Sequence, residues 1–293
     1  MLPLLSQAAT LGVLYPEVRE PYHQVYASIV EGIEGEYKQE VRRFVVTDNS
    51  TADSVRQWVE MHEIDALVVL GNQSLAYLPE DNQLPVVVGG TILKPGPESL
   101  AGITLNPSPS LLFGGLLKLK PSVTDIHVVY EPDYNEWVVA EANKAAEALD
   151  LTLHGHPVSG MRQAAAKYRE VQGTLNSDKA ALWLPLGGPS RESSILQTIL
   201  QKAWSGDQIV ISSNLSDVRR GALYALYPNN REMGRELAKL LKQCMTESAS
   251  ESEPRKLFLS STFQAVNLRT AEHIGLRLTR DDLKDFEFVY PPL

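Results

Sequence analysis

Polar and aromatic side chains gather directly after the short apolar runs of this 293-residue sequence, where the strands of a parallel sheet would end. Such residues offer backbone N–H groups, hydroxyls and amides for hydrogen bonds, aromatic rings for apolar contact and carboxylates for a cation. Because each type is ordinary in a strand-to-helix loop, the prediction depends on the whole set. We predict as ligand contacts Tyr15, Glu17, Tyr22, Asn72, Gln73, Ser74, Gly90 and Thr91 in the first half, and Glu131, Tyr134, Gly188, Ser190, Asn214 and Asp217 in the second.

Motifs that would turn such a site into an enzyme are missing from the sequence. It contains neither a G-x-x-x-x-G-K-[ST] phosphate loop nor a G-x-S-x-G nucleophile elbow. Residues 187–190 read Gly-Gly-Pro-Ser, but Pro189 lacks an N–H group, so a tight turn is predicted there. His154 and His156 would share one face of a strand, yet no third ligand lies near them in the sequence. We therefore expect no catalytic residue, no metal and no cofactor.

The elements that must position the predicted contacts alternate between strands and helices. Apolar runs rich in β-branched residues predict strands at 11–14, 43–46, 66–70, 85–88 and 102–105, and again at 126–130, 151–156, 180–184, 208–211 and 222–226. Helical patterns separate them, and this alternation indicates parallel sheets with helices on both faces. The carboxyl ends of parallel strands meet at one edge, which is where such sheets bind ligands.

The two halves of the chain repeat one scheme. Residues 11–33 and 126–149 each read as a short apolar strand, a loop with Tyr, Pro and carboxylates, and an amphipathic helix. This repeat, in a chain too long for one core, predicts two similar α/β lobes with a cleft between them. We expect residues 1–105 with 229–258 in lobe 1, and 106–228 with 259–293 in lobe 2.

Proline residues mark the expected passages between the lobes. Pro107 and Pro109 follow the fifth strand, and Pro228 precedes a helical stretch at 232–244. A chain that crosses more than once forms a hinge of short segments that can open and close about a ligand. After the Ser/Glu-rich segment 245–256, which predicts a surface loop, we expect a strand at 257–259 and a capped helix over 267–275.

Charge and hydropathy exclude other classes of protein. The formal net charge is −9 and no run of five or more basic residues is present, which argues against nucleic-acid binding. No apolar stretch reaches the roughly 18 to 20 residues of a membrane span. The first residues are apolar but lack a positively charged region, so an intact signal peptide is not predicted.

Several of these segments resemble the substrate-binding proteins of ABC transporters, in the family that includes binding proteins for tryptophan and other aromatic amino acids. The resemblance includes 101–104, 126–130, 213–226, 230–238 and 266–275. Its most specific part is 217–226, which reads Asp-Val-Arg-Arg-Gly-Ala-Leu-Tyr-Ala-Leu, together with Gly234. The resemblance implies the type I periplasmic binding fold, with two Rossmann-like lobes of parallel sheets flanked by helices. It also implies an extracytoplasmic, monomeric protein that closes over a small organic ligand. Its partner would be an ABC permease in the membrane.

Departures from the family pattern bear on the ligand. At 88–91 the chain has Val-Gly-Gly-Thr where family members often carry an acidic residue and proline, and at 186–189 it has Leu-Gly-Gly-Pro where many have Thr-Asp-Asn. An amino-acid ammonium group would then need Glu17, Glu131, Asp133 or Asp217. Two other functions stay open: a ligand sensor that partners a membrane histidine kinase, and an enzyme that uses the cleft carboxylates.

Overall fold

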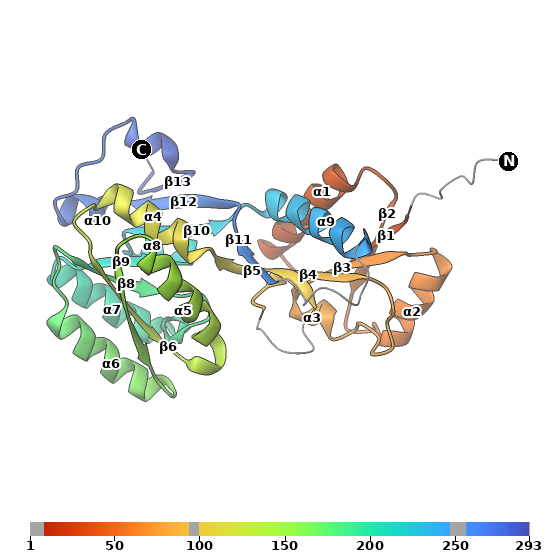
Figure 1. Cartoon of the computed structure of the whole chain (residues 1–293), viewed down its shortest axis with the longest axis horizontal. Coiled ribbons are helices and arrows are strands. Elements are labelled where there is room, and N and C mark those ends of the chain that lie inside the picture. Colours follow the sequence, from red (N-terminus) through yellow and green to blue (C-terminus); the bar gives the residue numbers. More distant parts are fainter. Residues whose placement is uncertain (1–8, 94–99, 247–255, 293) are drawn as a thin grey trace. The chain divides into compact units, whose positions relative to one another are not determined.

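The computed structural model describes residues 9–93, 100–246 and 256–292 (Figure 1). The chain divides into two compact units, and it passes from one to the other three times. Unit 1 comprises Met1–Leu105 and Asn229–Ser261, and unit 2 comprises Asn106–Pro228 and Thr262–Leu293. Each unit is an α/β layer structure built on one predominantly parallel sheet, as the alternating pattern predicts.

Unit 1 is built on a six-stranded sheet with the order β11-β5-β4-β3-β1-β2. The pairs β1–β2, β1–β3, β3–β4 and β4–β5 are parallel. The strands are β1 (Leu11–Pro16), β2 (Val41–Val46), β3 (Ala66–Leu70), β4 (Val86–Thr91), β5 (Ala101–Pro107) and β11 (Lys256–Leu259). The helices are α1 (Tyr22–Tyr37), α2 (Ala52–Met61), α3 (Gly71–Leu75) and α9 (Asn230–Thr246).

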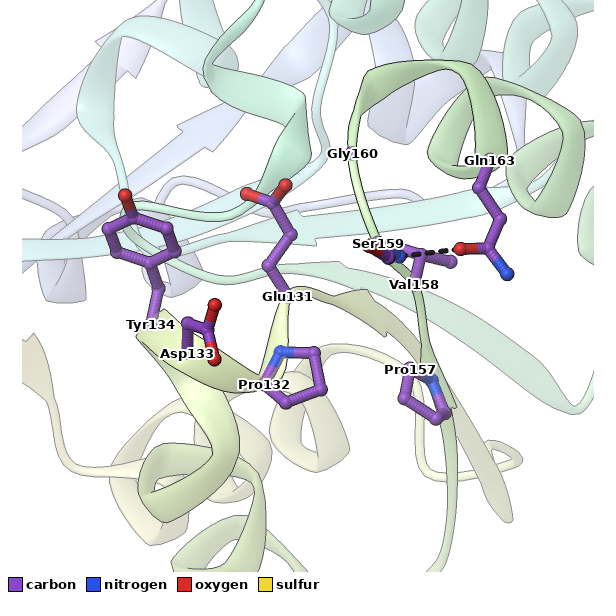
Figure 2. Close-up of a pocket in the computed structure, with 9 residues that line it drawn as sticks. All are labelled: Glu131, Pro132, Asp133, Tyr134, Pro157, Val158, Ser159, Gly160 and Gln163. Carbon is purple, nitrogen blue, oxygen red and sulfur yellow. Dashed lines mark hydrogen bonds between the residues drawn. The ribbon is translucent and has the colours of Figure 1, made fainter.

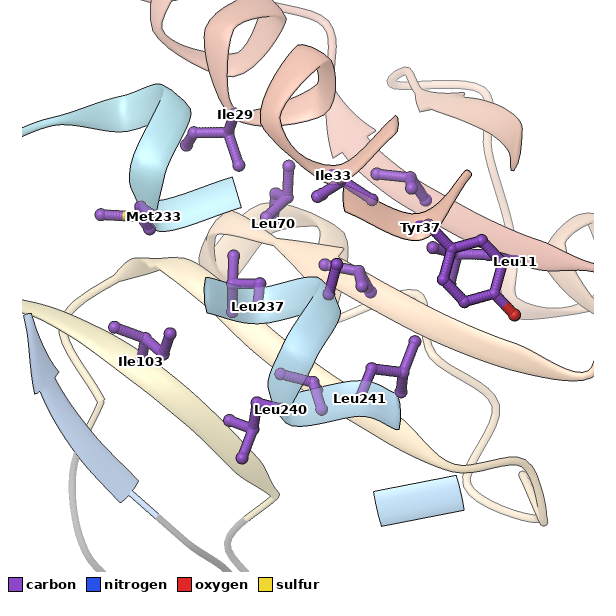
Figure 3. Close-up of a cluster of buried hydrophobic side chains, with 14 of the residues drawn as sticks. Leu11, Ile29, Ile33, Tyr37, Leu70, Ile103, Met233, Leu237, Leu240 and Leu241 are labelled. Atoms are coloured by element: carbon purple, nitrogen blue, oxygen red, sulfur yellow. The ribbon is translucent and has the colours of Figure 1, made fainter. Parts of the chain in front are cut away.

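Successive strand residues of unit 1 enter different cores, because side chains alternate across a sheet. Val13 and Val68 pack with α1 and α9 on one face, whereas Leu14 and Val69 pack with α2 on the other. Figure 3 shows Ile29 and Ile33 of α1 and Leu237, Leu240 and Leu241 of α9 in the first of these cores. The carboxyl edge of the sheet is thereby held by helices on both faces.

Unit 2 is built on a seven-stranded sheet with the order β13-β12-β10-β9-β8-β6-β7. Its strands are β6 (Asp125–Tyr130), β7 (Thr152–Pro157), β8 (Ala180–Leu184), β9 (Ile209–Ser212), β10 (Tyr224–Pro228), β12 (Thr262–Asn267) and β13 (Phe288–Tyr290). Its helices are α4 (Pro109–Leu119), α5 (Pro132–Glu147), α6 (Met161–Thr174), α7 (Ser193–Ser205), α8 (Leu215–Arg220) and α10 (Leu268–His273), with 3-10 turns η1 (Pro189–Arg191) and η2 (Asp282–Asp285). The pair β10–β12 is antiparallel.

Both faces of the unit 2 sheet are covered. Leu182 and Val210 pack with α6 and α7 on one face. On α4, Phe113 contacts Trp183 of β8 edge to face, with ring centroids 5.5 Å apart. The parallel strands from β7 to β10 therefore end at a carboxyl edge supported by buried apolar layers.

All ten predicted strands are present, with ends that differ by a few residues. The prediction missed the strands β12 and β13, and it placed no helix at Gly71–Leu75. The predicted loop 245–256 is wrong at its ends, because α9 continues to Thr246 and β11 begins at Lys256; residues 247–255 lie outside the described residues. The predicted cap at 267 is confirmed, since the Asn267 side chain accepts a hydrogen bond from the Thr270 N–H at 3.1 Å.

Candidate functional site

The carboxyl edge of the unit 1 sheet holds a hydrogen-bonded pair of predicted contacts. Thr91 belongs to β4 rather than to a loop, and Asn72 lies in α3. The Thr91 Oγ1 atom donates to the Asn72 Oδ1 atom at 2.6 Å. Thr91 is buried and Asn72 is exposed, so a buried hydroxyl fixes the orientation of an amide that reaches solvent.

Tyr26 of α1 lies beside this pair. A Cβ atom added to Gly71 would approach the Tyr26 hydroxyl to 2.6 Å, and one added to Gly90 would lie 3.5 Å from its ring. Both glycines have positive φ, +81° and +64°, so the backbone also favours glycine there. Partial burial raises the pKa of the Tyr26 phenol, which stays a neutral donor.

The other predicted contacts of unit 1 do not all join this group. Glu17 and Gln73 are exposed and line a small pocket of about 70 Å³ with Tyr77. Ser74 is buried, and its Oγ atom has no hydrogen-bond partner. Tyr22 is 65% exposed in the first turn of α1, and Tyr15 packs against the core from within β1, so neither lies in the predicted loop.

In unit 2, Glu131 and Tyr134 line an open pocket of about 400 Å³ (Figure 2). Glu131 precedes the first turn of α5, and Tyr134 lies within that turn. The opposite wall comes from the segment after β7, which includes Val158, Ser159 and Gly160. Figure 2 shows the Glu131 side chain between Tyr134 and this segment.

Two buried acceptor atoms at the start of α5 lack hydrogen-bond partners. The Glu131 Oε2 atom and the Asn135 Oδ1 atom are both buried and accept no hydrogen bond. The Asn135 amide instead donates from Nδ2 to the Leu186 carbonyl at 3.0 Å. Buried polar atoms usually accept a hydrogen bond, so two acceptors without one mark a place where a donor from another molecule would be stabilised.

Arg191 places a positive charge beside Glu131 and Tyr134 of this pocket. Its Nη2 atom lies 3.6 Å from the Glu131 Oε2 atom, and its guanidinium carbon lies 5.1 Å from the centroid of the Tyr134 ring. Its side chain is 48% exposed. The sequence prediction missed this residue, although it directly follows Ser190 and is a basic residue beside predicted contacts.

The predicted contacts Asn214 and Asp217 belong to a capped turn at the start of α8. The Asn214 side chain accepts from the Ser216 N–H, and the Ser212 hydroxyl donates to the Asp217 Oδ2 atom at 2.7 Å. Burial raises the pKa of the Asp217 carboxyl, while hydrogen bonds from Ser212 and Ser216 act in the opposite direction. These contacts account for both residues as local structure, so their contact with a ligand stays a prediction.

Ser190 and Gly188 lie in a turn. The Gly188 N–H donates to the Pro185 carbonyl at 3.2 Å, and Pro189 begins the 3-10 turn η1, as expected for a tight turn. Ser190 is buried beside Tyr168 of α6. Burial raises the pKa of the Tyr168 phenol well above its usual value, and the charges of Asp217 and Glu131 act in the same direction. Tyr168 was missed because nothing in its helical segment distinguishes it from a core tyrosine.

His154 and His156 of β7 lie beside a third histidine, His127, which the sequence prediction did not include. The Nδ1 atom of His127, in β6, lies 3.1 Å from the Nε2 atom of His156, and His127 stacks on His154. Within the described ranges, no group of three or more His, Cys, Asp or Glu side chains is arranged to hold a metal ion. No helix of the same ranges is both long and apolar enough to cross a bilayer.

Comparison with known proteins identifies the fold. No protein-family model and no curated protein matches the sequence. Among solved structures, a ligand-free, open substrate binding protein with adhesive properties from Clostridium difficile is 15% identical, with a TM-score of 0.66 over 96% of this chain and 99% of that one. An ABC domain in complex with L-Trp from Streptococcus pneumonia is 19% identical, with a TM-score of 0.58 over 96% and 99%.

A periplasmic ribose ABC transporter protein from Conexibacter woesei is 12% identical, with a TM-score of 0.51 over 88% of this chain and 91% of that one. Identities this low are informative about the fold alone. The chain has the type I periplasmic binding fold, which confirms the fold class predicted from the sequence.

Proposed function

We propose that this chain is an extracytoplasmic solute-binding protein of an ABC uptake system, which closes over a small organic ligand and delivers it to a membrane permease. The observation that carries the proposal is the Glu131 carboxylate. It lines a pocket at the carboxyl edge of a parallel sheet, and its Oε2 atom is buried without a hydrogen-bond donor. A carboxylate in that state favours a bound cationic or donor group.

The chemistry around Glu131 favours an amino acid with an aromatic side chain. The Glu131 and Asn135 oxygens that accept no hydrogen bond suit an ammonium group, which has three donors and no acceptor. Tyr134 is 41% exposed and offers a ring for apolar or stacking contact. The guanidinium of Arg191 suits a carboxylate. The Streptococcus pneumonia domain of the same fold was solved with L-Trp, which agrees with this choice.

The proposal keeps the remaining sequence-predicted residues as ligand contacts. In unit 1 the strongest of these are Asn72 and Thr91, because the hydrogen bond between them presents a fixed amide. A ligand that binds one conformation more tightly than another shifts the population toward it, and a permease can recognise that conformation. No bond of the ligand is broken.

A thermal-shift screen of amino acids, nucleosides and sugars tests the proposal. Ligand at about 100 times its dissociation constant adds roughly 2.7 kcal/mol to the free energy of unfolding. We expect an aromatic amino acid to raise the melting temperature, and Glu131→Gln to remove most of that increase. Glu141→Gln, within α5 and outside the pocket, is the matched control for the loss of one carboxylate.

Three outcomes would count against parts of the proposal. Stabilisation by sugars or nucleosides alone would overturn the amino-acid ligand. Equal responses in the two glutamate variants would remove Glu131 from the site. Failure of the ligand-loaded protein to stimulate a permease encoded beside it, reconstituted in liposomes, would argue against uptake. Light scattering tests the expected monomer.

A further inference from the structure

Three histidines share one face of the unit 2 sheet, at its edge. The parallel register of β6 and β7 sets His127 opposite His154, and His156 lies two residues further along β7 on the same face. The rings of His127 and His154 stack with centroids 4.5 Å apart. The planes of the His127 and His156 rings are nearly parallel, at 4°, and the Nδ1 atom of His127 lies 3.1 Å from the Nε2 atom of His156. The imidazoles therefore form one contiguous cluster.

The charged groups around this cluster come from β6 and α6. The Nε2 atom of His154 lies 2.8 Å from the Asp125 Oδ1 atom. On α6, Lys167 and Glu170 form an ion pair at 2.7 Å and act on His156 with opposite signs. Lys167 and a charged His154 both oppose a positive charge on His156, whereas Asp125 favours one on His127 and Glu170 favours one on His156.

The contact between His127 and His156 limits how many protons the pair can hold. One of the two facing nitrogens must donate and the other must accept, so the contact survives only while at least one facing nitrogen is unprotonated. Desolvation, together with the charges that His154 and His156 would carry, lowers the pKa of His127 to about 4. Desolvation and Lys167 also lower the pKa of His156. The closed cluster therefore binds fewer protons than the open one, so a fall in pH favours the open state.

The strands that carry these histidines lead directly into the walls of the pocket. β7 is the edge strand and pairs with β6 alone in the sheet order. β6 runs into Glu131, and β7 runs into Val158, whose N–H donates to the Tyr130 carbonyl at 2.9 Å. A displacement of β7 from β6 would therefore move the wall formed by Val158, Ser159 and Gly160 away from Glu131.

We propose that the cluster of His127, His154 and His156 is an acid-sensitive latch that holds edge strand β7 against β6 and opens the unit 2 pocket when it is protonated. The opening of β7 depends on the histidine cluster alone and not on the proposed function. Release of the ligand at acidic pH rests in addition on the proposed function. A protein with this latch would bind its ligand at neutral pH and release it in a mildly acidic compartment or medium.

Amide hydrogen exchange of the full chain tests the latch without a ligand. After correction for the intrinsic pH dependence of exchange, we expect the opening equilibrium of Thr152–Pro157 to rise about tenfold between pH 7.5 and 5. His127→Gln and His156→Gln should each flatten this dependence. His62→Gln in unit 1, remote in sequence and outside the cluster, should keep it.

A second measurement uses the unaltered protein, so it tests the latch even if the histidine variants do not fold. Proton NMR of the unaltered protein follows the imidazole C–H signals, and we expect His127 to titrate near pH 4 rather than near its ordinary value. A titration midpoint of His127 at the ordinary value for histidine would overturn the latch. So would hydrogen exchange whose pH dependence is unchanged in both His127→Gln and His156→Gln.

Ligand titrations at pH 7.5 and 5 separate the two proposals. If the best compound of the thermal-shift screen binds the unaltered protein more weakly at pH 5, and binds His127→Gln equally at both, the latch controls the site. If exchange is pH-dependent but binding is not, the link between latch and pocket is wrong. If no compound binds at any pH, the proposed function fails, and the exchange result decides the latch alone.

Discussion

Thr91 and Asn72 are joined by a short hydrogen bond that connects the end of β4 to the first turn of α3, with the threonine hydroxyl donating at 2.6 Å. The amide oxygen of Asn72 is thereby occupied, and its NH2 group is left to face solvent. An amide held in one orientation loses less entropy on binding than a freely rotating one. The bond thus prepares a donor at the carboxyl edge of unit 1.

Thr91→Val should weaken ligand binding more than it weakens the fold. Loss of one buried hydrogen bond costs about 1 kcal/mol of stability, and the freed amide should lower affinity several-fold. Thr104→Val is the matched control, because Thr104 is buried in the neighbouring strand β5 and accepts from the Leu93 N–H. Calorimetric titration and urea unfolding should show a similar stability loss in both variants and an affinity loss only in Thr91→Val. An equal affinity loss would indicate a general effect on unit 1.

Arg191→Met should change which ligands bind best. Its guanidinium lies within 3.6 Å of Glu131 and competes with a ligand cation for that carboxylate. Because a partly exposed ion pair contributes about 0.2–1 kcal/mol, its removal should raise affinity for an aromatic amine by about one and a half- to fivefold. Affinity for the matching amino acid should fall, since its carboxylate loses a partner.

Arg220→Met controls for the change in net charge, because Arg220 lies at the end of α8 and contacts Ser193 rather than Glu131. Calorimetric titrations with the amine and the amino acid should distinguish the two variants. If Arg191→Met and Arg220→Met change the two affinities alike, Arg191 acts through the net charge of the protein and not through its contact with Glu131.

Asp217→Asn should stabilise the protein at neutral and alkaline pH. Burial raises the folded-state pKa of Asp217 above its unfolded value, so the native carboxyl contributes stability below the unfolded pKa, and that contribution is lost as the pH rises through the folded pKa. Asparagine can still accept from Ser212 and carries no charge to desolvate.

We expect the Asp217→Asn melting temperature to exceed that of the unaltered protein by about 2–4 °C at pH 8, and the difference to vanish near pH 4. Differential scanning calorimetry across this range provides the check. A variant that is less stable at every pH would show that the charged form makes contacts that outweigh its desolvation.

Much of the fold could be predicted because local pattern and tertiary role agree. β3 and β8 are apolar runs buried along their whole length, which is the pattern of a central parallel strand. β13 could not be found this way, since it has three half-buried residues and depends on pairing with β12. The helix α3 was missed because Gly71 turns the chain directly from β3 into a helix through a positive φ.

The candidate site was predicted only where its residues follow one strand. Glu131 and Tyr134 are three positions apart and line one pocket. Arg191 reaches them from beyond β8, and Val158 from beyond β7, so their approach depends on strand order. The pairing of His127 with His156 depends on the β6–β7 register, which joins residues 29 positions apart and has no local signal.

Gly234→Ala should be among the most damaging small substitutions in unit 1. A Cβ atom there would lie 2.0 Å from the Ile29 carbonyl oxygen of α1, and one on Gly32 would lie 1.9 Å from the Arg231 carbonyl oxygen of α9. Because both neighbours are helix backbone, the helices would have to separate, at a cost of about 2–4 kcal/mol.

Gly35→Ala on the partner helix α1 is the control, because a Cβ atom at Gly35 would have no neighbour within 4 Å. There the substitution should raise stability by about 0.5–1 kcal/mol, since alanine favours a helix more than glycine does. Urea unfolding followed by circular dichroism should therefore move the midpoint down for Gly234→Ala and up for Gly35→Ala. Midpoints that move in the same direction would mean that helix propensity, rather than the close approach of α1 and α9, decides stability at these positions.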